Sequence, residues 1–261
     1  MKVYSVQLDV SQGNKSLNLK RAKKLIEEHP IEPRSLIVLP EMFGTGFNLN
    51  LSETLPGEPS LTENFLGDLA ISHESWVIGG MISPTSKEKM GANRAFICDP
   101  FGNGIAHYDK MHLIPILGEE QVHIKGKCIE IINVGQFHVC PFICYDLRFP
   151  EIFRVAAGRG ATLFIVLACW PDSRIEHWSS LLKARAIENQ AYVVGVNATG
   201  SGSGMHYGGQ SIVFDPKGNI VESSQKHECI LESLLDLQEL VEWRREFPAL
   251  TQMQSDFLQK P

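Results

Sequence analysis

Cys144 lies at a place in the sequence where a cysteine can be reactive. In the segment VCPFICYDLRFPE (139–151) a predicted strand runs into a turn, and Pro150 suits the first position of the following helix. Backbone N–H groups at such a turn, and the positive end of the helix, stabilise a thiolate and a nearby oxyanion. The alternative from this segment alone is a buried structural cysteine, the usual fate of this residue type.

Two further charged residues follow predicted strands. Glu41, in LPEMFGTGF (39–47), ends an apolar strand, and the carboxyl ends of strands are where open α/β sheets place functional groups. Lys110, in HYDKMHL (107–113), follows a hairpin strand, and its ammonium group could stabilise an oxyanion and lower the pKa of a thiol. Taken singly, Glu41 is better explained as a solvated carboxylate at a strand end and Lys110 as a surface lysine.

Short apolar strands alternate with helical patterns along the chain, which predicts an α/β protein with buried, partly parallel sheets and helices outside. Two such sheets packed face to face give a four-layer αββα sandwich, and the sequence offers no linker, so residues 1–261 are predicted to form one domain. The predicted strands are 2–10, 35–39, 76–82, 92–98, 105–110, 129–134, 137–143, 161–168, 191–196 and a hairpin over 210–221. The predicted helices are one capped by Asn14, then 61–72, 150–159 and 177–190.

The turns DPFGNGI, from residue 99, and DPKGNI, from residue 215, resemble each other. Each closes a half of the chain that contains strands, helices and a hairpin. The similarity indicates either an internal duplication or turn chemistry that both hairpins favour independently.

Together, the Glu, Lys and Cys motifs resemble those of the nitrilase superfamily of carbon–nitrogen hydrolases, over nearly the whole chain. The resemblance implies that Cys144 is the nucleophile, Glu41 the general base and Lys110 the cation that stabilises the oxyanion, together with the Tyr145 backbone N–H. It also implies a second glutamate between Lys110 and Cys144. GEEQVHIKG offers Glu119 or Glu120, and Glu120 is preferred because E-x-x-H-x-K better resembles the family pattern.

Later segments narrow the resemblance to the bacterial omega-amidases. These segments are CWPDSR (169–174), HWSSLLKARAIENQAYVVGVN (177–197), HYGGQS (206–211) and RREFP (244–248). The resemblance implies hydrolysis of the terminal amide of 2-oxoglutaramate or 2-oxosuccinamate through a thioester, with release of ammonia. It also allows another short amide, an N-carbamoyl compound or a deaminated glutathione as the substrate.

A small anionic amide needs a cation for its distant carboxylate and apolar walls that exclude water. Arg148 and Arg174 are the candidate cations, because a guanidinium binds a carboxylate through two hydrogen bonds. The sequence does not distinguish between the two arginines. The candidate wall residues are aromatic, and each could instead belong to the hydrophobic core: Phe43, Phe47, Tyr145 and Trp170.

Composition excludes several other classes. The net charge of −6, with no basic stripe, argues against a nucleic-acid or anionic-membrane partner. No signal peptide is recognisable and no apolar run approaches the ~20 residues that span a bilayer, so a cytoplasmic location is expected. The six cysteines and nine histidines show no metal-ligand spacing, so neither a metal nor another cofactor is expected.

The remaining alternatives are a non-catalytic binding module and an acyltransferase that uses a small amine instead of water. The resemblance also implies a homodimer. The C-terminal segment, about residues 231–261, contains an apolar stretch that would cover either a partner subunit or its own domain.

Overall fold

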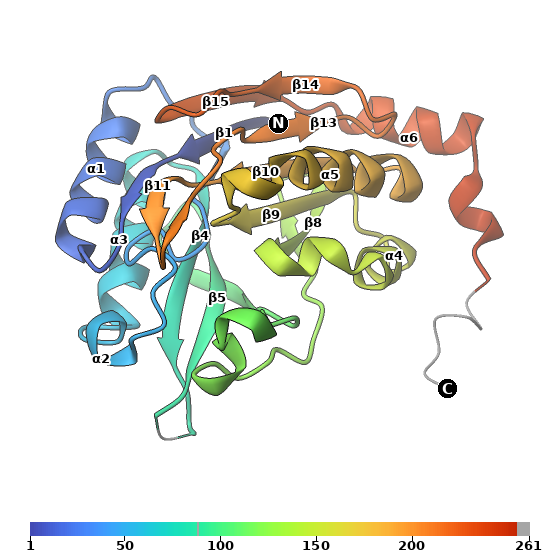
Figure 1. The fold of residues 1–261 in the computed structure, drawn as a ribbon. Helices are drawn as coiled ribbons and strands as arrows, with labels where there is room; N and C mark the ends of the chain where they lie inside the picture. The colour runs from blue at the N-terminus through green and yellow to red at the C-terminus, as the bar shows by residue number, and fades with distance from the viewer. Residues whose placement is uncertain (88, 255–261) are drawn as a thin grey trace.

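The computed structural model describes residues 1–87 and 89–254. Two six-stranded sheets form the centre of this part of the chain (Figure 1). The spatial order of the first sheet is β15 (Cys229–Leu234), β1 (Lys2–Gln7), β3 (Leu36–Val38), β4 (Trp76–Pro84), β5 (Gly91–Cys98) and β6 (Gly104–Asp109). The order of the second is β14 (Ile220–Ser223), β13 (Ile212–Phe214), β10 (Tyr192–Asn197), β9 (Leu163–Ala168), β8 (Phe137–Ile143) and β7 (Ile132–Val134).

The two sheets have the same internal arrangement. In the first, β1, β3 and β4 are parallel, and β5 and β6 continue the sheet as antiparallel strands. In the second, β8, β9 and β10 are parallel, and β13 and β14 continue it in the same way. This agreement is the structural repeat that the two similar turns suggest.

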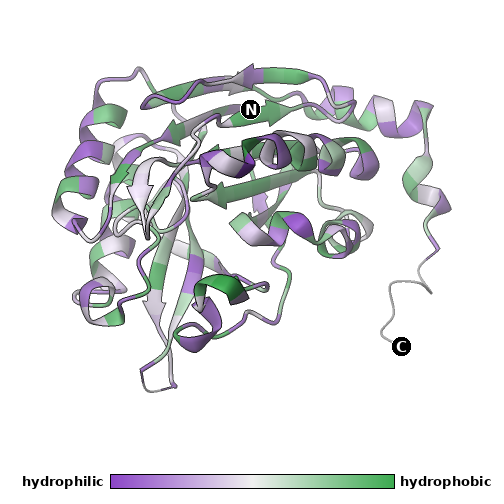
Figure 2. Cartoon of the chain, in the orientation of Figure 1, coloured by the Kyte–Doolittle hydropathy of each residue, from purple (hydrophilic) through white to green (hydrophobic). Residues whose placement is uncertain are grey.

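Alternation of side chains along the strands builds two hydrophobic layers. On β3, Leu36 and Val38 belong to the cluster shared with the second sheet, whereas Ile37 packs with the helices on the other face. On β9 every residue is buried, so its hydrophobic character is continuous (Figure 2). A strand covered on both faces has no position for a solvated side chain.

Helices cover the outer face of each sheet, so the predicted four-layer αββα sandwich is confirmed (Figure 1). The longer helices are α1 (Lys15–Glu27) and α3 (Ser60–Ser72) beside the first sheet, and α4 (Pro150–Gly158) and α5 (Ile175–Asn189) beside the second. The Asn14 side chain accepts a hydrogen bond from the Leu17 N–H and caps α1 as predicted.

The strand expected over residues 2–10 is corrected, because it is two strands. After β1, the short strand β2 (Asp9–Ser11) leaves the first sheet and pairs with β11 (Thr199–Gly202), which in turn pairs with β12 (Met205–His206). This small third sheet brings the glycine-rich segment around residue 202 to the end of the sandwich where the cavity described below lies.

The C-terminal segment packs on its own chain as far as the structure describes it. β15 pairs with β1, and α6 (Leu237–Glu246) buries Leu240 completely in the core of the second sheet. Residues 255–261 of the predicted partner-binding segment lie outside the described residues. The shorter helices are α2 (Leu51–Thr54), η1 (Pro115–Leu117), η2 (Glu119–Gln121), η3 (Cys144–Arg148), η4 (Asp172–Arg174) and η5 (Ala249–Gln252).

Candidate active site

The carboxyl ends of strands from both sheets meet at one end of the sandwich. Glu41 follows β3, Lys110 follows β6 and Cys144 follows β8, so residues separated by up to 103 positions in sequence converge (Figure 1). The backbone of Glu41 approaches β4 so closely that a Cβ on Gly80 would lie 2.5 Å from the Glu41 Cα. Glycine is therefore required there.

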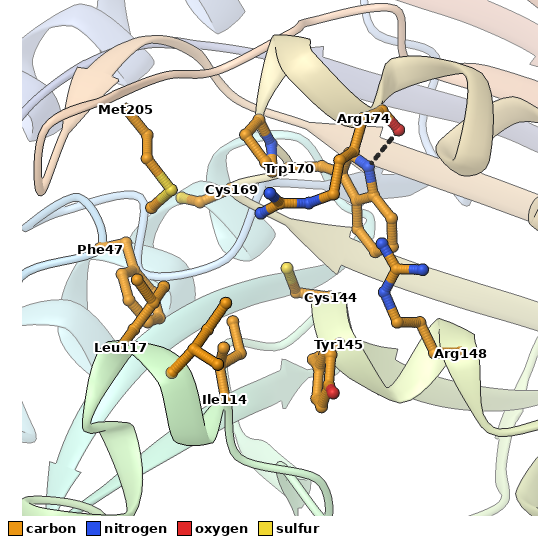
Figure 3. Close-up of a pocket in the computed structure, with 12 residues that line it drawn as sticks. Phe47, Ile114, Leu117, Cys144, Tyr145, Arg148, Cys169, Trp170, Arg174 and Met205 are labelled. Atoms are coloured by element: carbon orange, nitrogen blue, oxygen red, sulfur yellow. Dashed lines mark hydrogen bonds between the residues drawn. The ribbon is translucent and has the colours of Figure 1, made fainter.

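Cys144 begins the η3 turn with a positive φ of 46°. A non-glycine residue rarely adopts this conformation, and the surroundings must hold it in place. The buried Asp146 carboxylate does so, because it accepts hydrogen bonds from the Ile143 N–H (3.1 Å), the Tyr108 hydroxyl (2.8 Å) and the His112 N–H (2.9 Å). The tight turn presents the sulfur of Cys144 to the cavity (Figure 3).

Lys110 lies between two carboxylates in a fully buried ion cluster. Its Nζ is 3.0 Å from Glu41 Oε1 and 3.0 Å from Glu119 Oε2, and the three side chains are 0% exposed. The preference for Glu120 is thereby corrected: Glu119 joins the cluster, whereas Glu120 is exposed to solvent. The η2 turn directs only the first of the two glutamates inward, where the Ile114 N–H also donates to it at 2.8 Å.

The electrostatics of the cluster favour a charged lysine and a charged Glu119. Burial opposes the charge of Lys110, but the carboxylates of Glu119 and Glu41 outweigh burial and raise the pKa of Lys110. Burial likewise opposes the charge of Glu119, but chiefly Lys110 lowers the pKa of that carboxyl to about 2. The cluster therefore carries fixed charges at neutral pH.

Cys144 experiences the opposite balance. Burial, followed by the negative charge of Glu41, raises the pKa of the Cys144 thiol well above its ordinary value, and the Lys110 ammonium only partly offsets this. The resting side chain is thus a neutral thiol next to a carboxylate. Such a pair can transfer a proton from sulfur to oxygen as the sulfur forms a bond to an electrophile.

Two residues that the sequence did not single out also bind Glu41. The Cys169 N–H, directly after β9, donates to Glu41 Oε2 at 2.8 Å. The Asn93 side chain, in β5, donates to Glu41 Oε1 at 2.7 Å. The sequence signal for Asn93 is weak, because it is one of two adjacent polar residues, with Arg94, in a mostly apolar strand. Cys169 follows an apolar strand much as Cys144 does.

A cavity of about 350 Å³ opens onto the sulfur of Cys144. Figure 3 shows the guanidinium group of Arg174 above the Cys144 sulfur and that of Arg148 to its right, with Phe47, Leu117 and Ile114 to the lower left. Of the predicted wall and anchor residues, five line this cavity: Phe47, Tyr145, Arg148, Trp170 and Arg174. Residues that the prediction omitted also line it: Ile114, Ile116, Leu117, Cys169, Pro171 and Met205.

The expected role of Phe43 in the cavity wall is corrected. Phe43 is completely buried, packs against Phe65 and contacts β4 beside Gly79, so its side chain belongs to the core under α3. Phe47, four residues later, does reach the cavity, where its ring lies 5.4 Å from the Lys110 Nζ. The tight turn between the two directs one ring inward and the other toward the site.

The two arginines are held differently. The Arg148 guanidinium stacks over the Trp170 ring at 4.9 Å and lies 3.3 Å from His177 Nδ1. Arg174 is tied through its backbone, because its carbonyl accepts a hydrogen bond from the Trp170 indole N–H at 2.8 Å (Figure 3). Over residues 1–87 and 89–254 neither guanidinium forms an ion pair with a carboxylate, so both have donors to offer to an anion in the cavity.

Within the described residues, no three His, Cys, Asp or Glu side chains are arranged to hold a metal ion. No helix in the same part of the chain has both the length and the apolar character needed to cross a membrane.

Comparisons with known proteins agree with this geometry. The carbon-nitrogen hydrolase family matches residues 2–245. The chain is 33% identical to the 2-oxoglutaramate amidase of Bacillus subtilis, covering 97% of this chain and 98% of that protein. It is 36% identical to the omega-amidase YafV of Yersinia enterocolitica, covering 89% of this chain and 88% of that protein.

Among solved structures, a CN-hydrolase superfamily protein from Xanthomonas campestris, with an arsenic adduct in its active site, has a TM-score of 0.89 at 28% identity. The match covers 98% of this chain and 97% of that one. Family, relatives and fold all lead to the same conclusion: this chain belongs to the carbon–nitrogen hydrolase family and is an amide-hydrolysing enzyme.

Proposed function

We propose that the enzyme hydrolyses the terminal amide of a small 2-oxo acid amide, 2-oxoglutaramate or 2-oxosuccinamate, through a thioester on Cys144. The observation that carries the proposal is that the Cys144 sulfur lines a cavity together with two arginines, while the buried ion pair of Glu41 and Lys110 lies close enough to the same thiol to shift its pKa. The names of the relatives from Bacillus and Yersinia support the same substrate class.

In the first half-reaction the Cys144 sulfur attacks the amide carbonyl carbon while Glu41 accepts the thiol proton. The oxyanion that forms is stabilised by the Lys110 ammonium and the Tyr145 backbone N–H. The proton then passes from Glu41 to the departing nitrogen. The C–N bond breaks, ammonia leaves and a thioester remains on the sulfur.

In the second half-reaction water attacks the thioester. Glu41 removes a proton from the water molecule and returns it to the sulfur as the C–S bond breaks. The product is a 2-oxo dicarboxylic acid, and the enzyme is restored to its neutral thiol. Glu119 takes no proton in this sequence; it holds Lys110 in position through contacts of 3.1 and 3.0 Å to the Nζ.

The substrate class follows from the far side of the cavity. A substrate with its amide carbon at Cys144 extends its carboxylate toward Arg148 and Arg174, where a guanidinium can donate two parallel hydrogen bonds. Because Arg148 already stacks on Trp170, we assign the carboxylate to Arg174 first. Arg174→Ala should raise KM at least about tenfold with a smaller change in kcat, as expected when binding shared by ground and transition states is lost.

The test is mass spectrometry of the enzyme mixed with 2-oxoglutaramate, with ammonia release measured in parallel. We expect an acyl adduct on the Cys144 peptide of the parent enzyme when the reaction is quenched during turnover, a much slower appearance of that adduct in Glu41→Gln, and no adduct on Cys144→Ala. Faster ammonia release from N-carbamoyl amino acids or deaminated glutathione would reject the 2-oxo acid assignment while keeping the mechanism. Transfer of the acyl group to added amines in preference to water would reject hydrolysis.

Two expectations from the sequence stay predictions. Exposed apolar side chains on α5, on α6 and directly after α6, namely Ile187, Val241 and Phe247, support a homodimer, which sedimentation equilibrium would test. A cytoplasmic location also stays a prediction, to be tested by cell fractionation.

A further inference from the structure

Asn93 contacts every charged member of the buried cluster, although it does not line the cavity. It is 0% exposed, and its Nδ2 donates both to Glu41 Oε1 at 2.7 Å and to Glu119 Oε1 at 3.1 Å. Its backbone carbonyl accepts the Lys110 N–H at 2.9 Å. One residue of β5 therefore links both carboxylates to the strand end that carries the ammonium group.

The charges in the cluster make this link important. Two carboxyl groups share one ammonium in a site without solvent exposure, and His123 Nδ1 also lies 3.4 Å from Glu119 Oε1. Two carboxylates held this close repel each other strongly at low dielectric. Among the described side chains, those of Lys110 and Asn93 bridge Glu41 and Glu119. Lys110 must also direct a hydrogen toward the substrate, whereas Asn93 has no task at the cavity.

The orientation of the amide is fixed by the same contacts. Its Oδ1 is buried and has no hydrogen-bond partner, which is a cost to the folded state. Rotating the amide by half a turn would aim this oxygen at both carboxylates and remove both donated bonds. The observed orientation therefore leaves Oδ1 without a partner and directs the amide hydrogens to the two glutamates.

We propose that Asn93 is a positioning residue for the reaction, which holds the Glu41 carboxylate in line with Cys144 by bridging it to Glu119. The inference rests on the proposed function of Glu41 as the proton acceptor. The other titratable groups that face Glu41 are Lys110, Cys144, Cys169 and Tyr207, and His123 lies 3.4 Å from Glu119. Of these, Lys110 and the Cys169 backbone N–H also restrain the carboxylate, so loss of Asn93 weakens its alignment without releasing it entirely.

The first test is Asn93→Leu, which keeps the branching at Cγ but donates no hydrogen bond. We expect kcat to fall about 10- to 100-fold, part of the contribution of a positioned general base, while KM changes less than about twofold because the cavity wall is intact. The acyl adduct should form more slowly in the same proportion, since Glu41 acts in that step.

The second test is Asn93→Asp, which distinguishes positioning from a general loss of structure. The introduced carboxyl, when protonated, still donates one hydrogen bond; when ionised, it places a third negative charge beside Glu41 and Glu119. Activity relative to the parent enzyme should therefore fall as pH rises, whereas the ratio for Asn93→Leu should stay level across the same pH range.

A matched control is Asn189→Leu. Asn189 is also 0% exposed and also has a buried Oδ1 without a partner, but it lies at the end of α5 and donates to the Arg185 carbonyl. The Asn189→Leu substitution should lower the melting temperature without changing the pH profile of activity. Parallel pH profiles for Asn93→Asp and the parent enzyme, or an unchanged kcat in Asn93→Leu, would overturn the inference. Failure of the parent enzyme to acylate Cys144 would instead reject the proposed function.

Discussion

The two halves of the molecule share a strand order but contribute different chemistry. The half built on β1, β3 and β4 supplies Glu41 and Lys110, which are charged and fully buried. The half built on β8, β9 and β10 supplies Cys144 and the cavity-lining Trp170 and Arg174. The end of β3 carries Glu41 and the end of its counterpart β9 carries Cys169 and Trp170, whereas Lys110 follows β6 and Cys144 follows β8, which are not counterparts. The shared topology determines where side chains converge, and the residue at each strand end determines their chemistry.

The largest effect should separate two cysteines at neighbouring strand ends of the second half. Cys144→Ala should reduce ammonia release by on the order of 10⁴-fold or more, because the nucleophile is lost. Cys169→Ala should retain most activity, since alanine keeps the backbone N–H that donates to Glu41. Initial rates at saturating substrate measure both. Equal losses in the two variants would mean that the assignment of the nucleophile is wrong.

The ion cluster belongs to the first half alone, so its pH dependence should be specific to that half. The lowered pKa of Glu119 means that its stabilisation is fully present above its ordinary pKa of 4.5 and is lost as pH falls toward about 2. At 1.36 kcal/mol per pKa unit the loss amounts to about 3 kcal/mol.

The measurement is urea unfolding at pH 7, 4.5 and 3, on the parent enzyme and on Glu119→Gln. The free energy of unfolding of Glu119→Gln should be lower at pH 7 and should decline less between pH 4.5 and 3. Glu120→Gln, at the exposed neighbour, is the control and should behave as the parent does. If the free energy of unfolding declined equally in all three proteins, Glu119 would not contribute to the pH dependence of stability.

Glycines on equivalent strands, β4 and β10, allow a sharper comparison. A Cβ on Gly79 would lie 2.7 Å from Leu66 on α3, and one on Gly195 would lie 2.4 Å from Leu182 on α5, so both let a helix pack closely. Gly195→Ala should lower stability by about 1–3 kcal/mol and leave kcat unchanged. Gly80→Ala should lower kcat as well, because its Cβ would displace the Glu41 backbone. Unchanged kcat in Gly80→Ala would show that the base tolerates displacement.

The smallest effects should come from the two similar turns. Asp99 Oδ1 accepts from the Phe101 and Asn103 N–H groups, and Asp215 Oδ1 accepts from those of Lys217 and Asn219 in the same way. Asp99→Ala and Asp215→Ala should each lower the free energy of unfolding by about 1 kcal/mol, with no effect on turnover. Thermal melts would measure both. A difference of more than about 1 kcal/mol between the two would indicate that the turns are not equivalent.

The fold was predictable because its strands are almost wholly apolar and its helices have clear boundaries. Strands such as 161–168 and the Asn14 cap carry local signals that no tertiary contact overrides. The small sheet of β2, β11 and β12 was missed because the segment around residue 202 is rich in glycine and has no apolar alternation. Only long-range pairing with β2 makes it a strand.

Residue types and their places at strand ends predicted that Glu41, Lys110 and Cys144 belong to one site. The direction in which a side chain points within a turn was not predictable. Glu119 and Glu120 are adjacent in η2, and which one faces inward depends on the Ile114 and Lys110 contacts. Phe43 and Phe47 are separated by a tight turn that sends them to different places. Asn93 was overlooked because its importance comes from charges distant in sequence.

The neutral resting state of Cys144 bears on how the enzyme survives oxidants. Peroxides and alkylating agents react with thiolates far faster than with thiols, and burial together with Glu41 keeps this sulfur protonated. A nucleophile that loses its proton only while attacking a carbonyl is shielded from damage between turnovers. The exposed Cys128, rather than Cys144, should therefore be the first thiol consumed by dilute hydrogen peroxide.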